Sequence, residues 1–209
     1  VRMASAIWRK RLVIAAVILV LAAVHGIATM ILARQLESKL KELKAQGRPI
    51  TAADLVPAPV PDSDNGALIY EKAFKILDSE EYKAKEKAID SFSNPQAADV
   101  SDPALTQDVE EAVRQFRQLS SLAQEAQERP RCRFDVNWEA GFNAELTHYP
   151  RLRNLARFLC ADAILNARNG NSQQAIDLIQ AAYCISDSIA DELTIIGMLV
   201  RIAMVGMAK

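Results

Sequence analysis

Several residue types are scarce in this sequence, and each shortage excludes some classes of fold or of function. The 209 residues include only 7 glycines, 8 prolines and 6% aromatics, which argues against a fold rich in β-strands. The three cysteines have no C-x-x-C spacing, so a dense disulfide framework and a cysteine-only zinc site are excluded. A net charge of −1 gives no electrostatic case for binding nucleic acid. We therefore expect an all-α protein without a nucleic-acid partner.

One long apolar run stands near the N-terminus. Residues Leu12–Ala33 carry no charge, and a helix of this length spans roughly 33 Å, enough to cross a bilayer core. Arg9, Lys10 and Arg11 precede the run. It is longer than the apolar core of a cleaved signal peptide, and Gly26–Ala28 is a mediocre cleavage site. We interpret 12–33 as an uncleaved transmembrane helix.

Charge around the run predicts how the chain is oriented. Residues 1–11 contain four Arg or Lys side chains and are expected to stay in the cytoplasm, which places the C-terminal part outside. Residues 34–48 carry five basic side chains that suit anionic lipid headgroups, whereas 62–111 carry thirteen acidic against five basic. The predicted location is the cell membrane, with a single pass and a periplasmic domain.

Residues 34–61 read as a juxtamembrane helix and a stalk. The helix is expected to run to about Ala45, because Gly47 and Pro49 follow. Thr51 and Asp54 suit a capping box. The alternating prolines of 56–61 favour polyproline II, a semi-rigid spacer.

Residues 62–209 form the predicted extracytoplasmic domain, an irregular helical bundle or a short solenoid. Apolar residues recur there every three to four positions, interrupted by capping residues, glycine and proline. This spacing predicts about six helices, at 67–77, 80–91, 103–129, 150–168, 173–189 and 193–207, with a loop at 93–102. Ser79, Asp102 and Ser172 are the capping residues predicted for the second, third and fifth of these helices. A short extended segment is expected at 134–138, where Phe134, Val136 and Trp138 alternate with polar residues.

Two resemblances add to this interpretation. The stretch Leu159–Ala182, with Ala163, Gly170 and Ala175, is similar to one tetratricopeptide helix-turn-helix unit, although Asn166 stands where that unit has a large aromatic. No second copy occurs at a period of 34. The order of basic tail, span, Pro-rich stalk, PDSDNGALIYEKAF, CRFDVNWEAGF and LRNLARFLCADAILNARNG resembles a group of uncharacterised bacterial single-pass membrane-anchored helical proteins. It implies a location and a helical fold, and no activity.

The last apolar run is the main functional candidate. On a helix over 193–207, one side carries Ile195, Leu199 and Ile202, and an adjacent side carries Ile196, Val200 and Ala203. Together they exceed the roughly 100° stripe that a one-sided core helix needs, so we expect a protein partner or a second copy to cover part of it. The predicted function is a membrane-anchored interaction or scaffold subunit without catalysis or a cofactor.

The alternative is an enzyme or a cofactor-binding subunit. His25 lies within the predicted span, where it could contact a tetrapyrrole or a neighbouring helix. Glu145 and His148 have the i, i+3 spacing of di-iron carboxylate bundles, but the second pair that such a site needs is missing.

Two other groups of side chains have open interpretations. Cys160 and Cys184 come close if the chain folds back near residue 171. They could then form a disulfide or remain two free thiols. The six arginines between 129 and 157 fit an acidic partner or a lipid headgroup, or they pair with the acidic 62–111 region.

The orientation can be tested with reporter fusions. A reporter that is active only in the periplasm should work when it is fused after Lys209, because the basic residues 1–11 hold the other end in the cytoplasm. Activity of a cytoplasm-only reporter at the same position, with silence of the periplasmic one, would reverse this orientation.

Overall fold

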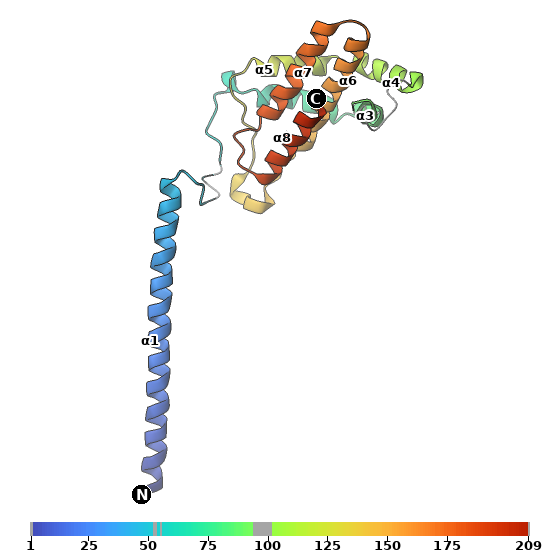
Figure 1. Cartoon of the computed structure of the whole chain (residues 1–209). Helices are drawn as coiled ribbons and strands as arrows, with labels where there is room; N and C mark the ends of the chain where they lie inside the picture. The colour runs from blue at the N-terminus through green and yellow to red at the C-terminus, as the bar shows by residue number, and fades with distance from the viewer. Residues whose placement is uncertain (1, 52–53, 55, 94–101, 209) are drawn as a thin grey trace. The chain divides into compact units, whose positions relative to one another are not determined.

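A computed structural model describes the backbone of residues 2–51, 54, 56–93 and 102–208, and their side chains except those of 2–17 and 142. The all-α prediction is confirmed, since 75% of the chain is helical and the described residues contain no strand. The chain divides into two compact units, residues 1–54 and 55–209 (Figure 1). The predicted loop at 93–102 lies almost wholly outside the described residues.

The first unit is built on α1 (Arg2–Ala45), one uninterrupted helix. Its segment Ile18–Ala45 is long and apolar enough to cross a membrane. The predicted end near Ala45 is confirmed: Gly47 has φ +70°, and the N–H of Arg48 donates to the carbonyl of Leu43 at 3.1 Å. These are the positive φ and the 6→1 bond of a Schellman motif.

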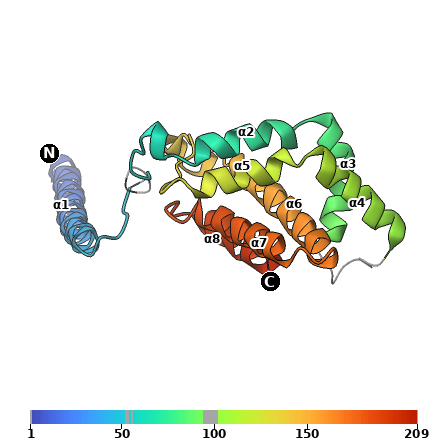
Figure 2. The same cartoon turned by 90° about the horizontal axis from the view of Figure 1, so that it is seen from above.

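The second unit contains seven α-helices within its described residues, one more than predicted. They are α2 (Ala67–Leu77), α3 (Glu80–Phe92), α4 (Pro103–Gln115), α5 (Gln118–Gln127), α6 (His148–Arg168), α7 (Ser172–Asp187) and α8 (Ile195–Met207), with short 3-10 turns η2 (Asp62–Asp64) and η3 (Trp138–Asn143). In Figure 2, α6 lies between the α2–α5 pair and the α7–α8 pair, and α3 and α4 pack at one end.

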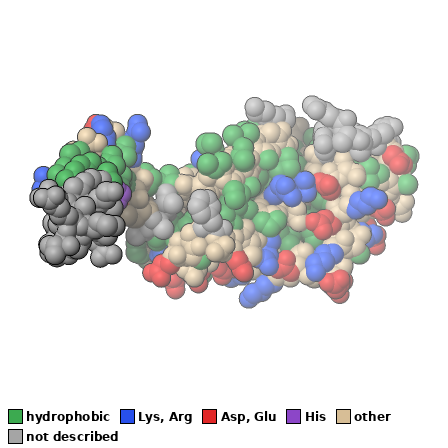
Figure 3. Space-filling model, turned by 90° about the horizontal axis from the view of Figure 1, so that it is seen from below, with side chains coloured by type: hydrophobic (Ala, Val, Ile, Leu, Met, Phe, Trp, Pro, Cys, Tyr) green, Lys and Arg blue, Asp and Glu red, His purple; other side chains and the backbone are tan. Residues whose placement is uncertain are grey.

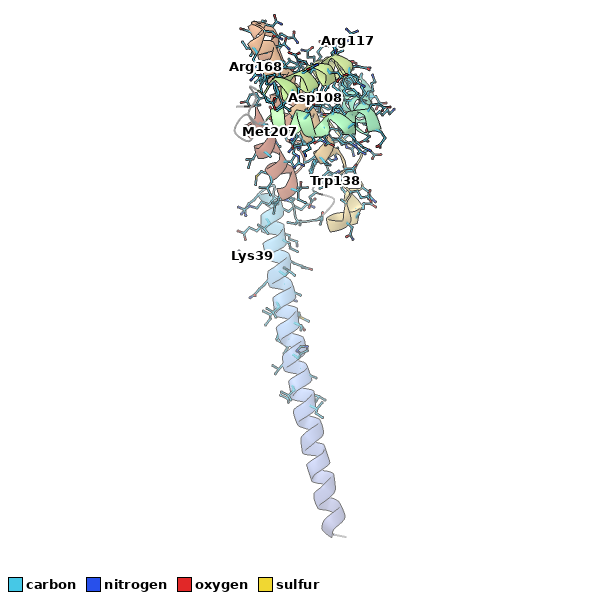
Figure 4. All side chains as sticks on the ribbon, turned by 90° about the vertical axis from the view of Figure 1, so that its right-hand side faces the viewer. Lys39, Asp108, Arg117, Trp138, Arg168 and Met207 are labelled. Atoms are coloured by element: carbon cyan, nitrogen blue, oxygen red, sulfur yellow. The ribbon has the colours of Figure 1, made fainter. Side chains whose placement is uncertain are left out.

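The extra helix arises because the predicted helix over 103–129 is broken at Phe116. This residue leaves the helical region with φ −106° and ψ 23°, and its buried ring meets Tyr82 edge-on at 5.3 Å between centroids. The break, beside Arg117 in Figure 4, sends α4 against α3 and α5 against α2. One apolar stripe runs through both helices, so periodicity alone does not reveal the bend.

The predicted capping residues are confirmed at two helices. The Ser79 hydroxyl accepts the Tyr82 N–H at 3.2 Å to start α3, and the Asp102 carboxylate accepts the Ala104 N–H at 2.9 Å to start α4. The end of α6 is also as predicted, because Gly170 has φ +78° and the Asn171 N–H bonds the carbonyl of Asn166 at 2.9 Å.

Three local predictions need correction. Helix α6 begins at His148, not at Pro150, and Asn171 takes the N-cap position of α7 that was predicted for Ser172. The extended segment predicted at 134–138 ends one residue early, because residues 134–137 belong to no helix or strand but Trp138 does not continue them. Instead, Trp138 opens the turn η3, where Figure 4 labels it, and the neighbouring loop is held by Asn65. The Asn65 side chain accepts the Arg133 N–H at 2.8 Å and donates to the Arg133 carbonyl at 3.0 Å.

One buried carboxyl joins α5 to α6. Asp162 is 8% exposed and accepts hydrogen bonds from the Ser120 hydroxyl at 2.7 Å and the Asn166 amide at 2.9 Å. Burial outweighs both bonds, so the pKa of Asp162 is raised. Its contribution to stability is therefore fully present below the unfolded pKa of about 3.9 and is lost as the pH rises through the folded value.

Replacing this acid by its amide should stabilise the protein at neutral pH. In Asp162→Asn, an oxygen still faces the Asn166 amide, and no charge is buried, so the urea midpoint at pH 7 should rise above that of the unmodified protein. The gain should shrink as the pH falls toward 4. Asp135→Asn, at an exposed position, is the matched control and should change little. A lower midpoint for Asp162→Asn at pH 7 would show that its hydrogen bonds outweigh the burial of its charge.

Candidate functional site

Helix α8 starts with a tight approach to α6. Thr194, with φ −110° and ψ 146°, caps the helix by accepting the Gly197 N–H at 2.8 Å. Gly197 is buried, and a Cβ built there would lie only 2.7 Å from the Tyr149 hydroxyl oxygen. A glycine is therefore needed at this position for α8 to lie so close to the first turn of α6.

A buried polar network fixes the segment just before α8. The Glu192 carboxylate is 7% exposed and accepts hydrogen bonds from the Tyr149 hydroxyl at 2.5 Å and from His148 Nε2 at 3.0 Å. Because a carboxylate only accepts, Nε2 carries the proton in this pair. The Phe134 ring stacks on the imidazole with centroids 4.4 Å apart. Burial, and then the bond to Glu192, raise the pKa of Tyr149, so its hydroxyl remains a donor.

The second half of α8 is held to both helices of the α6–α7 hairpin. Arg201 donates from Nε to the Ser186 carbonyl at 3.0 Å and pairs with Asp187 at 3.1 Å, both at the end of α7. The Cys160 thiol donates to the Met207 carbonyl at 3.5 Å. Since the start of α8 lies by the start of α6, these contacts make α8 parallel to α6 and antiparallel to α7.

The outward side of α8 is apolar and exposed. Of the six residues predicted to bind a partner, the four large exposed ones are Ile195 (76%), Ile196 (57%), Leu199 (58%) and Ile202 (61%). Ala203 is also exposed, but Val200 is half-buried and packs against the core. The structure adds Leu193 (59%) and Met198 (54%), which sequence reasoning missed. Met198 lies three residues after Ile195, so the same helical spacing was the signal that could have found it.

A shallow cavity of about 330 Å³ flanks this surface. It lies between Ile196 and Val200 of α8 and the first turns of α6, where Tyr149, Pro150 and Arg153 line it. The predicted surface is thus divided: Ile195, Leu199 and Ile202 point outward, while Ile196 and Val200 border the cavity.

The candidate metal ligands Glu145 and His148 do not form a site together. His148 is bound to Glu192 and not to Glu145, which is exposed in the loop before α6. Among the described residues, no three His, Cys, Asp or Glu side chains are placed to hold a metal ion. His25 is exposed on α1, and the contact predicted for it remains a prediction.

The three cysteines are free thiols in this structure. Of the two alternatives for Cys160 and Cys184, a disulfide or two free thiols, the structure therefore has the free thiols. Burial raises the pKa of Cys160 to about 11 and that of Cys132 to about 12, which leaves both thiols protonated near neutral pH. Cys184 lines one cavity with Cys132, not with Cys160.

Two of the six clustered arginines pair with the acidic region, as one of the predictions had it. Arg151 contacts Asp78 at 3.0 Å, and Arg157 contacts Asp90 at 2.8 Å. Figure 3 likewise shows acidic and basic side chains interspersed over one face of residues 55–209.

Comparison with known proteins does not extend these observations, because no protein-family profile, curated sequence or solved structure matches this chain.

The Glu192 network should be required for the placement of α8. In Glu192→Gln, the charge-assisted bonds from Tyr149 and His148 are lost inside the protein, and the free energy of unfolding should fall by about 1–3 kcal/mol in urea titrations. Asp191→Asn changes the neighbouring, exposed acid and should have little effect. Equal stability of the two variants would mean that the network does not hold α8.

Proposed function

We propose that this protein is a membrane-anchored interaction or scaffold subunit of a bacterial envelope or membrane complex, with no catalysis of its own. The observation that carries the proposal is the outward side of α8, where Ile195, Leu199 and Ile202 are each more than half exposed. Isolated apolar residues on a surface are ordinary, but adjacent ones on a single helix face are typical of a contact site.

The energetics favour a surface that is completed by association. Fully burying a leucine or isoleucine side chain contributes about 1.5–3 kcal/mol, and the fold leaves this contribution unused along α8. The same helix is fixed by a cap, a buried carboxylate and an arginine, so it is presented in one orientation. A rigid apolar helix lowers the entropy cost of binding a partner.

The membrane part of the proposal rests on α1. With residues 12–33 of α1 as the anchor, residues 1–11 lie in the cytoplasm and residues 62–209 on the extracytoplasmic side, with the lipid bilayer as the first partner. Anchoring confines the domain to one surface, which raises the encounter rate with partners in the same membrane.

The proposal is tested by cross-linking in native membranes. A photoreactive residue at position 199 of the full-length chain should give protein adducts, whereas one at position 68, an exposed leucine on α2, should not. Replacing Leu199 and Ile202 together by Glu should remove the association seen by co-purification and leave the thermal midpoint almost unchanged, because their burial occurs only in the complex. Unfolding of this variant without a separate effect on association would make α8 internal core, and the proposal would lose its main support.

A further inference from the structure

Two cysteines that are far apart in the sequence border one cavity. Cys132 lies in the loop after α5 and Cys184 lies on α7, and both line a cavity of about 240 Å³. Tyr70 of α2 also lines it, so three parts of the fold meet around this space. The fold therefore brings together two thiols that are separated along the chain.

The contacts of Cys132 place it on the same side of α7 as Cys184. Burial raises the pKa of Cys132, and a hydrogen bond with Ser188 opposes this rise. Ser188 follows Cys184 by one helical turn, and its N–H donates to the Cys184 carbonyl at 3.0 Å. Side chains four residues apart on a helix are neighbours, with about 5–6 Å between their Cβ atoms. Cys132 thus bonds to the residue that neighbours Cys184 on α7.

The Tyr70 hydroxyl supports the same placement. Burial raises the pKa of Tyr70, and Cys132 and Cys184 both add to the rise. The electrostatic effect of one group on another falls off with distance, so both sulfurs lie near this one hydroxyl.

The backbone on either side of Cys132 is fastened, which keeps its side chain at the cavity. The Arg131 N–H donates to the Asp64 carbonyl at 3.2 Å, and the Arg133 N–H donates to the Asn65 side chain at 2.8 Å. Because residues 132–137 belong to no helix or strand, small local shifts can still bring the sulfurs to the about 2.05 Å of a disulfide.

The third cysteine lies elsewhere. The Cys160 thiol donates to the Met207 carbonyl of α8, and Cys160 is not among the residues that line the cavity. Of the three possible pairs, only Cys132 with Cys184 shares one space.

We propose that Cys132 and Cys184 form a disulfide, with a protein or small-molecule disulfide of the extracytoplasmic space as the oxidant. The inference rests on the proposed function, which places residues 62–209 outside the cytoplasm, since disulfides form and persist in oxidising compartments such as the periplasm. The cross-link would fasten the loop after α5, and through it the segment before α2, to α7.

The reaction is a thiol–disulfide exchange in two steps. The thiolate of one cysteine attacks a sulfur of the oxidant, whose S–S bond breaks, and one oxidant thiol leaves. The second cysteine then attacks the mixed disulfide and releases the other oxidant thiol. Two electrons and two protons pass from the cysteines to the oxidant. Burial raises the pKa of both cysteines, so the thiolates are scarce near neutral pH and the exchange should accelerate as the pH rises.

The test treats the full-length protein in detergent with oxidised glutathione and maps the linked peptides by mass spectrometry. Cys132 should be joined to Cys184, while Cys160 should remain open to alkylation. The thermal midpoint should be about 10 °C higher in the oxidised than in the reduced protein, because the cross-link restricts the unfolded chain. Cys132→Ser and Cys184→Ser should each abolish this rise, and Cys160→Ser, the matched control, should keep it. Each variant is compared with its own reduced form, so a loss of basal stability does not affect the result.

Three free thiols after oxidation, or a linked peptide that contains Cys160, would overturn the inference. Alkylation of the thiols in intact cells, before lysis, tests the compartment separately and should find the same pair already joined. If the pair joins with glutathione but is reduced in cells, the pairing stands and the extracytoplasmic location in the proposed function is contradicted.

Discussion

Burial of α6 is the constraint on which the rest of residues 55–209 depends. Leu152, Leu155, Phe158 and Leu159 are completely inaccessible to solvent, and each of α2, α3, α4, α5, α7 and α8 packs on this helix. A helix that is surrounded in this way sets the position of every neighbour, because a close-packed interior transmits any displacement. The bend at Phe116 belongs to the same arrangement, since it brings α4 against α3 and α5 against α2 while both helices stay in contact with α6.

Apolar burial alone does not determine how helix α8 is rotated about its own axis. A helix that is apolar on most of its circumference gains similar free energy from burying any of its faces. Polar contacts and one glycine decide its rotation here. Gly197 admits Tyr149, Glu192 accepts from Tyr149 and His148, and Arg201 reaches the end of α7. Replacing one member of such a buried polar network leaves its partners unpaired inside the protein, which is costly, so the network makes one arrangement much better than its alternatives.

Local sequence signals such as caps and helix ends were sufficient to predict most of the helices. They failed where contacts between residues far apart in the sequence determine the structure. Caps such as Ser79 and Asp102, and helix ends such as Gly47 and Gly170, act within five residues and could be read from the sequence. The apolar outer side of α8 was also predicted, because it follows from helical spacing. The Glu192–Tyr149 pair was not, since its members are 43 residues apart and neither has a neighbour that marks it. The half-buried state of Val200 depends on the same tertiary contacts.

The exposed apolar side of α8 also bears on how strong an association has to be. The few isoleucine and leucine side chains on this side contribute about 1.5–3 kcal/mol apiece when fully buried, before the costs of association are subtracted. Such a contact is modest between molecules that are free in solution. Molecules held in one membrane meet at a higher effective concentration, so a modest contact is then enough. An anchor and a small apolar face therefore suit each other, and a larger exposed face would instead favour non-specific aggregation.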